Sequence, residues 1–279
     1  MLVSSLILTK NEEINLPGCL DSLSWCDDIV IFDSFSTDNT VEIARSRGAR
    51  VFQRKFVNYG AQREAARTLV EYKHPWVLAL DADERPTTEL VSEIDRILKT
   101  GASQHVAYRI RHKDFFMGRW IKHSSLYPSW FIRLYMNDKI SYPARGVHEY
   151  PKVQGSLGEL QAHVLHYSFN KGLAEWIAKH NRYSSMEAAE AIAELENCPL
   201  DWQRLAQFDD PVIRRRFLKS LSYRLPFRPA LRFAYMYVFR RGFLDGVPGL
   251  TYCTLLSFYE YLIVLKMKEI RARNEGREL

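Results

Sequence analysis

The sequence predicts an α/β fold whose N-terminal part is a parallel sheet with helices between its strands. Short apolar runs alternate with helically spaced apolar residues four times before residue 100, which is the pattern of βαβ units. Polar residues follow three of the predicted strands directly, at residues 9–12, 33–38 and 81–84. Because ligands bind outside the carboxyl ends of strands in such sheets, these segments predict a nucleotide-sized crevice at one sheet edge.

Each early element has its own signal. Apolar runs of strand length predict strands at residues 2–9, 29–32, 49–52 and 77–80. One predicted helix has Pro17 near its start, the next stops at Gly48, and a third spans 60–71. A fourth opens at Pro86 and stops near Gly101.

After Gly101 the pattern changes. Further strands are predicted at 105–111, 130–136 and 162–169, and apolar residues at helical spacing predict a helix over 171–197. We therefore expect a sheet domain over residues 1–170 and a helical region over 171–279.

Positive charge is concentrated at the C-terminal end of the chain. The formal net charge is +6, and residues 211–279 hold 14 Lys and Arg against 5 Asp and Glu. These basic residues alternate with aromatic residues, and Pro226, Pro229 and Pro248 predict a division into short helices. The pattern predicts peripheral binding to an anionic membrane surface. Packing of ordinary basic helices on the sheet domain is the alternative, and the absence of a recognition motif argues against nucleic acid.

We expect the protein in the cytoplasm, peripheral on the inner face of the cytoplasmic membrane. The four cysteines lack metal or redox spacing, and the N-terminus lacks the pattern of a signal peptide. The most apolar stretch, 249–265, contains Glu260 and several polar residues, so a spanning helix is not expected. The sequence carries no signal for an oligomeric state.

The acidic segment after the fourth strand has the chemistry of a metal site. Asp81, Asp83 and Glu84 supply hard oxygen donors of the kind that Mg²⁺ and Mn²⁺ prefer. No glycine-rich dinucleotide motif or P-loop follows any predicted strand, which argues against a dehydrogenase and a P-loop NTPase. A metal held by carboxylates is the direct alternative for neutralising a diphosphate.

Three segments in order, 5–12, 33–40 and 81–84, resemble the signatures of family 2 glycosyltransferases. Segments 145–149 and 166–168 add a likeness to bacterial lipopolysaccharide-core and exopolysaccharide β-glucosyltransferases. The resemblance implies a GT-A fold, with a Rossmann-like mixed sheet flanked by helices. It also implies an inverting enzyme that moves a hexose, with glucose as first candidate, from a UDP-sugar to a lipid-anchored saccharide.

The same resemblance implies roles for particular residues. The Asp-x-Asp motif suggests Asp83 as a ligand of Mn²⁺ or Mg²⁺, with Asp81 near the ribose or reaching the metal through water. His166 would complete the metal shell, with His163 as the alternative. Asp33 resembles a base-recognising aspartate. The residues implied in nucleotide-sugar binding are Thr9, Asn11, Glu12, Asp33, Gln62, Arg63, Asp81 and Ala82.

Inversion needs one general base for the acceptor hydroxyl. Glu149 is the first candidate by resemblance and Asp114 the second. Two rival functions remain at the level of sequence. One is a nucleotidyltransferase, which usually needs a glycine-rich loop after its first strand. The other is a non-catalytic, membrane-bound saccharide-binding module.

Overall fold

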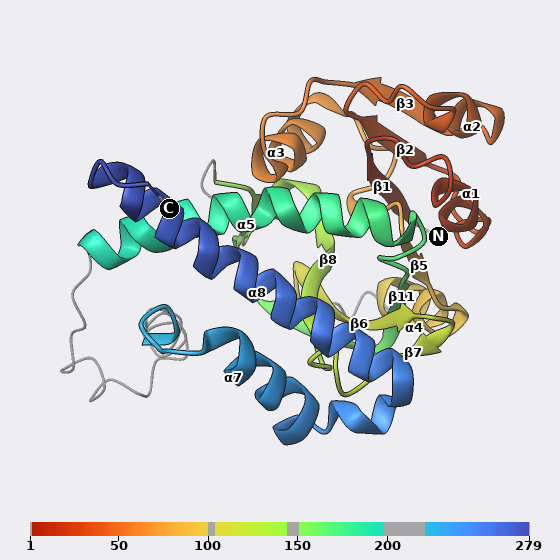
Figure 1. The fold of residues 1–279 in the computed structure, drawn as a ribbon. Helices are drawn as coiled ribbons and strands as arrows, with labels where there is room; N and C mark the ends of the chain where they lie inside the picture. Colours follow the sequence, from red (N-terminus) through yellow and green to blue (C-terminus); the bar gives the residue numbers. More distant parts are fainter. Residues whose placement is uncertain (1, 100–103, 144–150, 198–220, 279) are drawn as a thin grey trace. The chain divides into compact units, whose positions relative to one another are not determined.

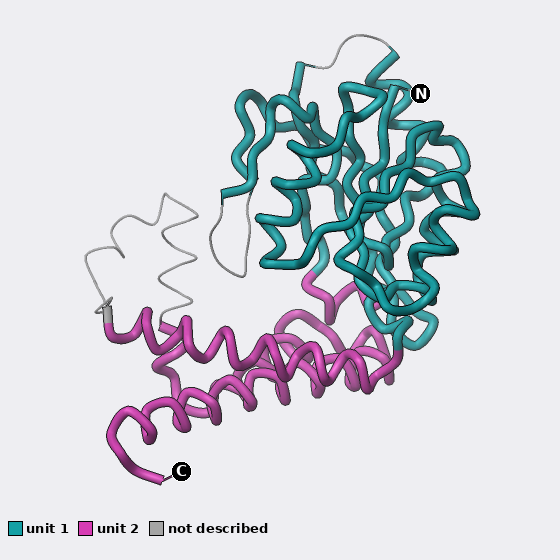
Figure 2. The backbone as a smooth tube through the Cα atoms, turned by 90° about the horizontal axis from the view of Figure 1, so that it is seen from above, with its two compact units in different colours: residues 1–120, 127–171 teal, residues 121–126, 172–279 magenta. Residues whose placement is uncertain are grey.

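The computed structural model describes residues 2–99, 104–143, 151–197 and 221–278. The chain divides into two compact units, which are residues 1–120 with 127–171 and residues 121–126 with 172–279 (Figure 2). Segment 121–126 thus groups with the helical unit although strands of the first unit flank it in the sequence.

The first unit is built on a mixed sheet in the order β3–β2–β1–β4–β8–β6–β11–β5, with β7 paired to β6 (Figure 1). β1 to β4 pair in parallel, as the alternation of strands and helices predicts. β8 runs antiparallel to both β4 and β6, which makes the sheet mixed. The mixed α/β fold is confirmed. The strands of this sheet are β1 (Val3–Thr9), β2 (Ile29–Asp33), β3 (Arg50–Gln53), β4 (Trp76–Asp81), β5 (Glu84–Pro86), β6 (Ala107–Phe116), β7 (Arg119–Trp120), β8 (Trp130–Met136) and β11 (Leu157–His166).

Alternation along the central strands gives the sheet an apolar layer on each face. In β4, Leu78 and Leu80 belong to one buried cluster with α1, α2 and α4. Val77 and Ala79 belong to a second cluster with α3 and the hairpin β9–β10. The elements on the two faces are α1 (Leu16–Asp21), α2 (Thr40–Ser46), α3 (Tyr59–Leu69), α4 (Thr88–Lys99), β9 (Ile140–Ser141), which follows the 3₁₀ turn η1 (Asn137–Lys139), and β10 (Lys152–Val153).

The second unit is helical. Its core joins α5 to α8 through buried residues such as Ala188, Ile192, Ile263 and Met267. The prediction of short helices broken by proline is wrong for Pro248, because it lies in the first turn of a 29-residue helix, where its missing N–H costs nothing. The elements are α5 (Gly172–Asn197), α7 (Arg228–Ala234), the π-helix η3 (Tyr235–Phe239), the 3₁₀-helix η4 (Gly242–Asp245) and α8 (Gly246–Asn274).

Strand register brings the polar strand ends of the first unit together. Thr9 at the end of β1 pairs with Asp33 at the end of β2, and Leu8 pairs with Asp81 at the end of β4. Further along the strand order, His166 at the end of β11 pairs in register with Asp114 of β6 and with Glu84 of β5.

Candidate active site

Asp33 is the centre of the first polar cluster. It is fully buried, and its carboxylate accepts hydrogen bonds from Thr9 Oγ1 at 2.9 Å and Gln53 Nε2 at 3.0 Å. The amide and the hydroxyl of Ser36 donate to it as well. Burial alone would raise the pKa of Asp33, but these donors, led by Ser36, hold it below its ordinary value. Four donors use the capacity of one carboxylate, so contact with a uracil N3–H requires one of them to give way.

The loop after β1 is tied to the loop after β2. The Asn11 amide donates to Ser36 Oγ at 2.8 Å, and Asn11 Oδ1 accepts from the Thr37 amide at 2.8 Å. Glu12 accepts from Lys171 Nζ at 2.8 Å. Burial raises the pKa of Glu12, and Lys171 opposes that rise. Asn11 therefore links the two loops, and Glu12 links the first of them to Lys171.

Gln62 projects from α3 and is buried. Its Nε2 donates to Ser34 Oγ at 3.1 Å and to the Arg54 carbonyl at 3.2 Å. Its Oε1 has no hydrogen-bond partner within the described part of the chain. A buried acceptor in that state suits a ligand donor. The Ala82 methyl group, in contrast, lies in the apolar core.

Asp81 is held between two arginines. Arg63 Nη2 of α3 lies 2.9 Å from Asp81 Oδ1, and Arg133 Nη2 of β8 lies 2.8 Å from Oδ2. Burial opposes ionisation, but Arg133 and then Arg63 hold the pKa of Asp81 well below its usual range. Because each oxygen already meets a guanidinium, the geometry favours Asp83 over Asp81 as the metal ligand.

Glu84 supports the turn that carries Asp81 and Asp83. Its side chain is 1% exposed, it forms an ion pair with Arg133, and its Oε2 accepts from the Asp81 amide at 3.0 Å. Burial raises the pKa of Glu84 to about 7 despite Arg133. Neighbouring His112 is also buried, and burial followed by the charge of Arg133 lowers its pKa well below the usual value. These contacts make Glu84 a support of the turn.

His166 is the centre of the second polar cluster. Its Nδ1 lies 2.6 Å from Asp114 Oδ1, and its Nε2 lies 3.5 Å from Asp83 Oδ2. Burial lowers the pKa of His166, but Asp83 and Asp114 outweigh it and raise the pKa well above the ordinary value. A carboxylate on Nδ1 fixes the ring so that Nε2 points to the Asp83 side, as the partner of a metal-binding histidine does.

These two side chains fit a metal only as part of a larger shell. Asp83 offers a hard oxygen and His166 a nitrogen, and Mn²⁺ accepts that nitrogen more readily than Mg²⁺ does. Among the described residues, no group of three or more His, Cys, Asp or Glu side chains is arranged to hold a metal. A metal ion held by these two side chains would need further ligands.

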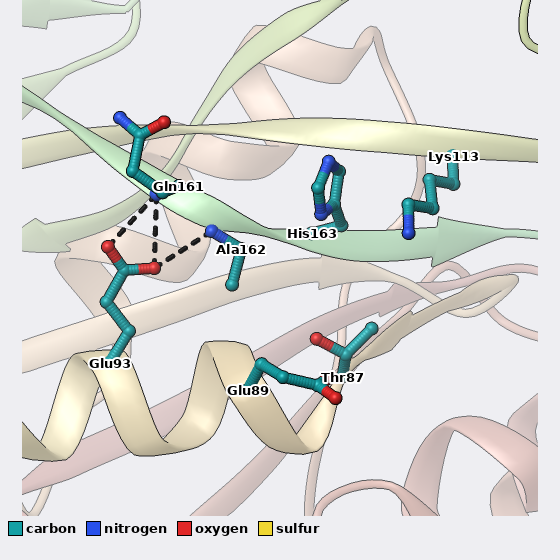
Figure 3. A pocket seen from close by; sticks show the side chains of 7 residues that line it. All are labelled: Thr87, Glu89, Glu93, Lys113, Gln161, Ala162 and His163. Carbon is teal, nitrogen blue, oxygen red and sulfur yellow. Dashed lines mark hydrogen bonds between the residues drawn. The ribbon is translucent and has the colours of Figure 1, made fainter.

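A separate groove of about 520 Å³ lies along the β11 edge beside α4 (Figure 3). Glu93 accepts from the amides of Gln161 and Ala162 there and so caps the strand edge. His163 lines this groove, and its Nε2 lies 2.8 Å from the Tyr127 hydroxyl. The structure thus brings His166, and not His163, to Asp83.

The sequence analysis missed Arg133 and His112. Arg133 stands at a buried position of the strand predicted over 130–136, where alternation calls for an apolar side chain, and the buried His112 lies just beyond the strand predicted over 105–111. A charged residue at such a position is the only signal that was available, because burial of arginine requires a partner. Asp114, the second candidate for the general base, contacts His166. Glu149, the first candidate, lies outside the described residues.

The mixed α/β sheet with carboxylates clustered at its strand ends is the arrangement of GT-A enzymes. The sequence profile of glycosyl transferase family 2 matches residues 4–152. The chain belongs to this family and is a glycosyltransferase.

The relatives that match almost the whole chain include two proteins from different genera. The uncharacterized glycosyltransferase RT0209 of Rickettsia typhi is 25% identical over 286 residues, covering 98% of this chain and 89% of its own. The lipopolysaccharide core biosynthesis glycosyltransferase LpsC of Rhizobium meliloti is 26% identical over 269 residues, covering 91% and 90%. Among solved structures, TarS of S. aureus in complex with UDP-GlcNAc aligns with a TM-score of 0.47 at 15% identity, covering 99% and 93%. Family membership sets aside the nucleotidyltransferase and the non-catalytic module.

Proposed function

We propose that the protein transfers a hexose, with glucose as first candidate, from a UDP-sugar to a lipid-anchored saccharide, with inversion at the anomeric carbon. The observation that carries the proposal is that His166 contacts Asp114 and faces Asp83 of the Asp81–Glu84 turn, in a chain of family 2. The name of the LpsC relative supports lipopolysaccharide core synthesis as the setting, and exopolysaccharide synthesis is the alternative that the sequence resemblance offers.

On the donor side, Asp83 and His166 would hold a divalent ion, which when bound supplies Lewis-acid stabilisation of the departing diphosphate. His166 must lose its Nε2 proton before that nitrogen can bind a metal, and Asp114 keeps the ring oriented meanwhile. Arg63 and Arg133 hold Asp81 at the nucleotide side of the turn.

On the acceptor side, one carboxylate takes the proton of the acceptor hydroxyl. The hydroxyl oxygen attacks the anomeric carbon at the same time, from the side opposite the leaving UDP. Glu149 is the proposed base and Asp114 the alternative. The 2.6 Å contact of Asp114 with His166 supports giving the role to Glu149, because Asp114 is already used to orient a ring. Retained transfer in Glu149→Gln would move the role to Asp114.

A thermal-shift panel of UDP, UDP-sugars and GDP-sugars, with and without Mn²⁺, tests the donor. A ligand at a hundred times its Kd stabilises the native state by about 2.7 kcal/mol, which is roughly 5–10 °C for a chain of this size. We expect a shift with UDP compounds that grows with Mn²⁺. Asp83→Asn should lose the Mn²⁺ increment, while Glu89→Gln, an exposed acid on α4, should keep it. No shift with any UDP compound would refute the proposal.

A further inference from the structure

The helical unit carries large apolar side chains on its outside. Leu231, Tyr235 and Val238 follow one another at helical spacing along α7 and η3, and all three are exposed. In a soluble helix this spacing marks the face that is buried in the core. Here the outer face of the helix is the apolar one.

The corner between η3 and α8 continues this apolar outside. Phe239 is 78% exposed and Val247 is 67% exposed, and Phe243 and Leu244 of η4 between them are exposed as well. Figure 1 shows this stretch of the chain in blue, from α7 to the start of α8. We call the residues Tyr235, Val238, Phe239, Phe243, Leu244 and Val247 the outer aromatic surface.

The corner is closely packed on its inner side. Met236 and Cys253 are fully buried beneath it. A Cβ on Gly249 would lie 2.3 Å from the Gly242 carbonyl oxygen, which shows how closely η4 and α8 approach. With its inner volume filled in this way, the corner cannot turn the rings of Phe239 and Phe243 inward.

Cations accompany the apolar side chains. Residues 221–250 contain five arginines and one acidic residue. That acid, Asp245, is buried and accepts hydrogen bonds from the amides of His123 and Ser124. Arg240 and Arg241 stand between the exposed rings in the sequence, and Arg241 is exposed. The charge of this surface therefore complements an anionic partner.

The apolar character of α8 raises the question of a membrane span. The helix Gly242–Asn274 is long and apolar enough to cross a membrane, with 22% of its most apolar window buried. Within α8, however, Glu260 pairs with Arg228 of α7 at 2.7 Å. Lys266 donates to Asn181 and Ser184 of α5. These polar contacts fix the middle and end of α8 to α7 and α5 of the same unit.

We infer that the outer aromatic surface inserts into the headgroup boundary of an anionic bilayer, with Arg240 and Arg241 on the phosphates. Aromatic rings favour that boundary, and nearby arginines add attraction to acidic lipids. The inference rests on the proposed function only in that a lipid-anchored acceptor lies in such a bilayer. It specifies which side of the helical unit meets the membrane.

Flotation of the full-length protein with vesicles of phosphatidylcholine, with and without phosphatidylglycerol, tests this inference. We expect binding to the anionic vesicles that weakens as salt is raised. The double variant Phe239→Ser/Phe243→Ser should lower the partition coefficient roughly tenfold or more, because each ring leaves an apolar environment. Arg240→Gln/Arg241→Gln should lower it by about thirtyfold in total at low salt, and less at high salt.

The matched control is Phe56→Ser, which removes an exposed ring of the first unit and should leave flotation unchanged. Circular dichroism verifies that each variant is folded, and a folded double-Phe variant that still floats would refute the surface. Failure of the wild-type protein to bind anionic vesicles would refute it as well. Dimerisation lost in the same Phe variant would assign the surface to a second copy.

Binding to duplex DNA or RNA that depends on the arginines and not on the rings would assign the charge to nucleic acid and overturn the inference. Protein that alkaline carbonate fails to extract would show a span and overturn the in-plane arrangement. The thermal shift with UDP compounds is measured without vesicles, so it reports on the donor site separately and its failure leaves the flotation result interpretable.

Discussion

Replacement of Arg133 by methionine tests whether the buried ion pair beneath the Asp-x-Asp turn has the importance that its geometry indicates. The Arg133 side chain is 7% exposed and its partner Glu84 is 1% exposed, so the variant leaves a buried acid that must stay charged without its cation or take up a proton. Removing one partner of a buried pair costs about 3–5 kcal/mol. For a chain of this length the melting temperature should fall by roughly 6–20 °C.

Glu84→Gln is the matched variant. Its amide oxygen can still accept from the Asp81 amide, and Arg133 keeps its contact with Asp81. We expect a loss of about 1–2 kcal/mol for this change alone. The double variant should be more stable than the sum of the single losses predicts, by about 1–3 kcal/mol, because no unpaired charge remains.

The free energies of unfolding are measured by urea denaturation, followed by tryptophan fluorescence and circular dichroism together. Coincident transitions license a single free energy of unfolding for each variant. A loss under about 1 kcal/mol for Arg133→Met, or a double-variant coupling of zero, would contradict the reasoning, since surface pairs behave in that way.

Three further predictions concern the site and the fold. Asp83→Asn should reduce Mn²⁺-stimulated transfer by at least roughly a thousandfold while melting close to the wild type, and stimulation that persists would remove Asp83 from the metal. Asp114→Ala should raise the half-saturating Mn²⁺ concentration about 10–100-fold, because it frees the His166 ring; an unchanged metal titration would make Asp114 irrelevant to the ring. Asp28, buried and bound by Ser4, Arg50 and the Lys73 amide, has a pKa below its ordinary value because these donors outweigh burial. Its stabilisation is present above the unfolded pKa of about 4 and is lost as pH falls through the folded pKa. Asp28→Asn should therefore have a smaller free energy of unfolding than the wild type at pH 7, and the difference should disappear in acid. A difference that does not change with pH would refute this role of Asp28.

The strands whose side chains are buried on both faces were predictable from the sequence. The apolar runs before Thr9, Asp33 and Asp81 end where β1, β2 and β4 end. The helix predicted over 171–197 matches α5 closely, because a long helix repeats its signal over many turns. The three-residue strand β5 was missed, since its existence depends on pairing with β11.

The arrangement within the site was less predictable. The Asp-x-Asp motif could be recognised from adjacent residues, but its partner Arg133 comes from β8, and only the tertiary fold brings that arginine to Asp81. The antiparallel insertion of β8 between β4 and β6 positions Arg133, and such an order leaves no periodic signal in the sequence. The choice between His163 and His166 as the metal ligand likewise depends on the fold, because His166 faces Asp83 whereas His163 contacts Tyr127.

The central claim is inverting transfer from a UDP-sugar, and water can serve as the acceptor to test it. Incubation of the protein with UDP-glucose and Mn²⁺ should release UDP and glucose slowly, and proton NMR can record which anomer forms first. UDP-glucose carries an α-linkage, so the account predicts β-glucose first, with no release by Asp83→Asn. α-Glucose as the first product, or an equal rate with Asp83→Asn, would contradict it.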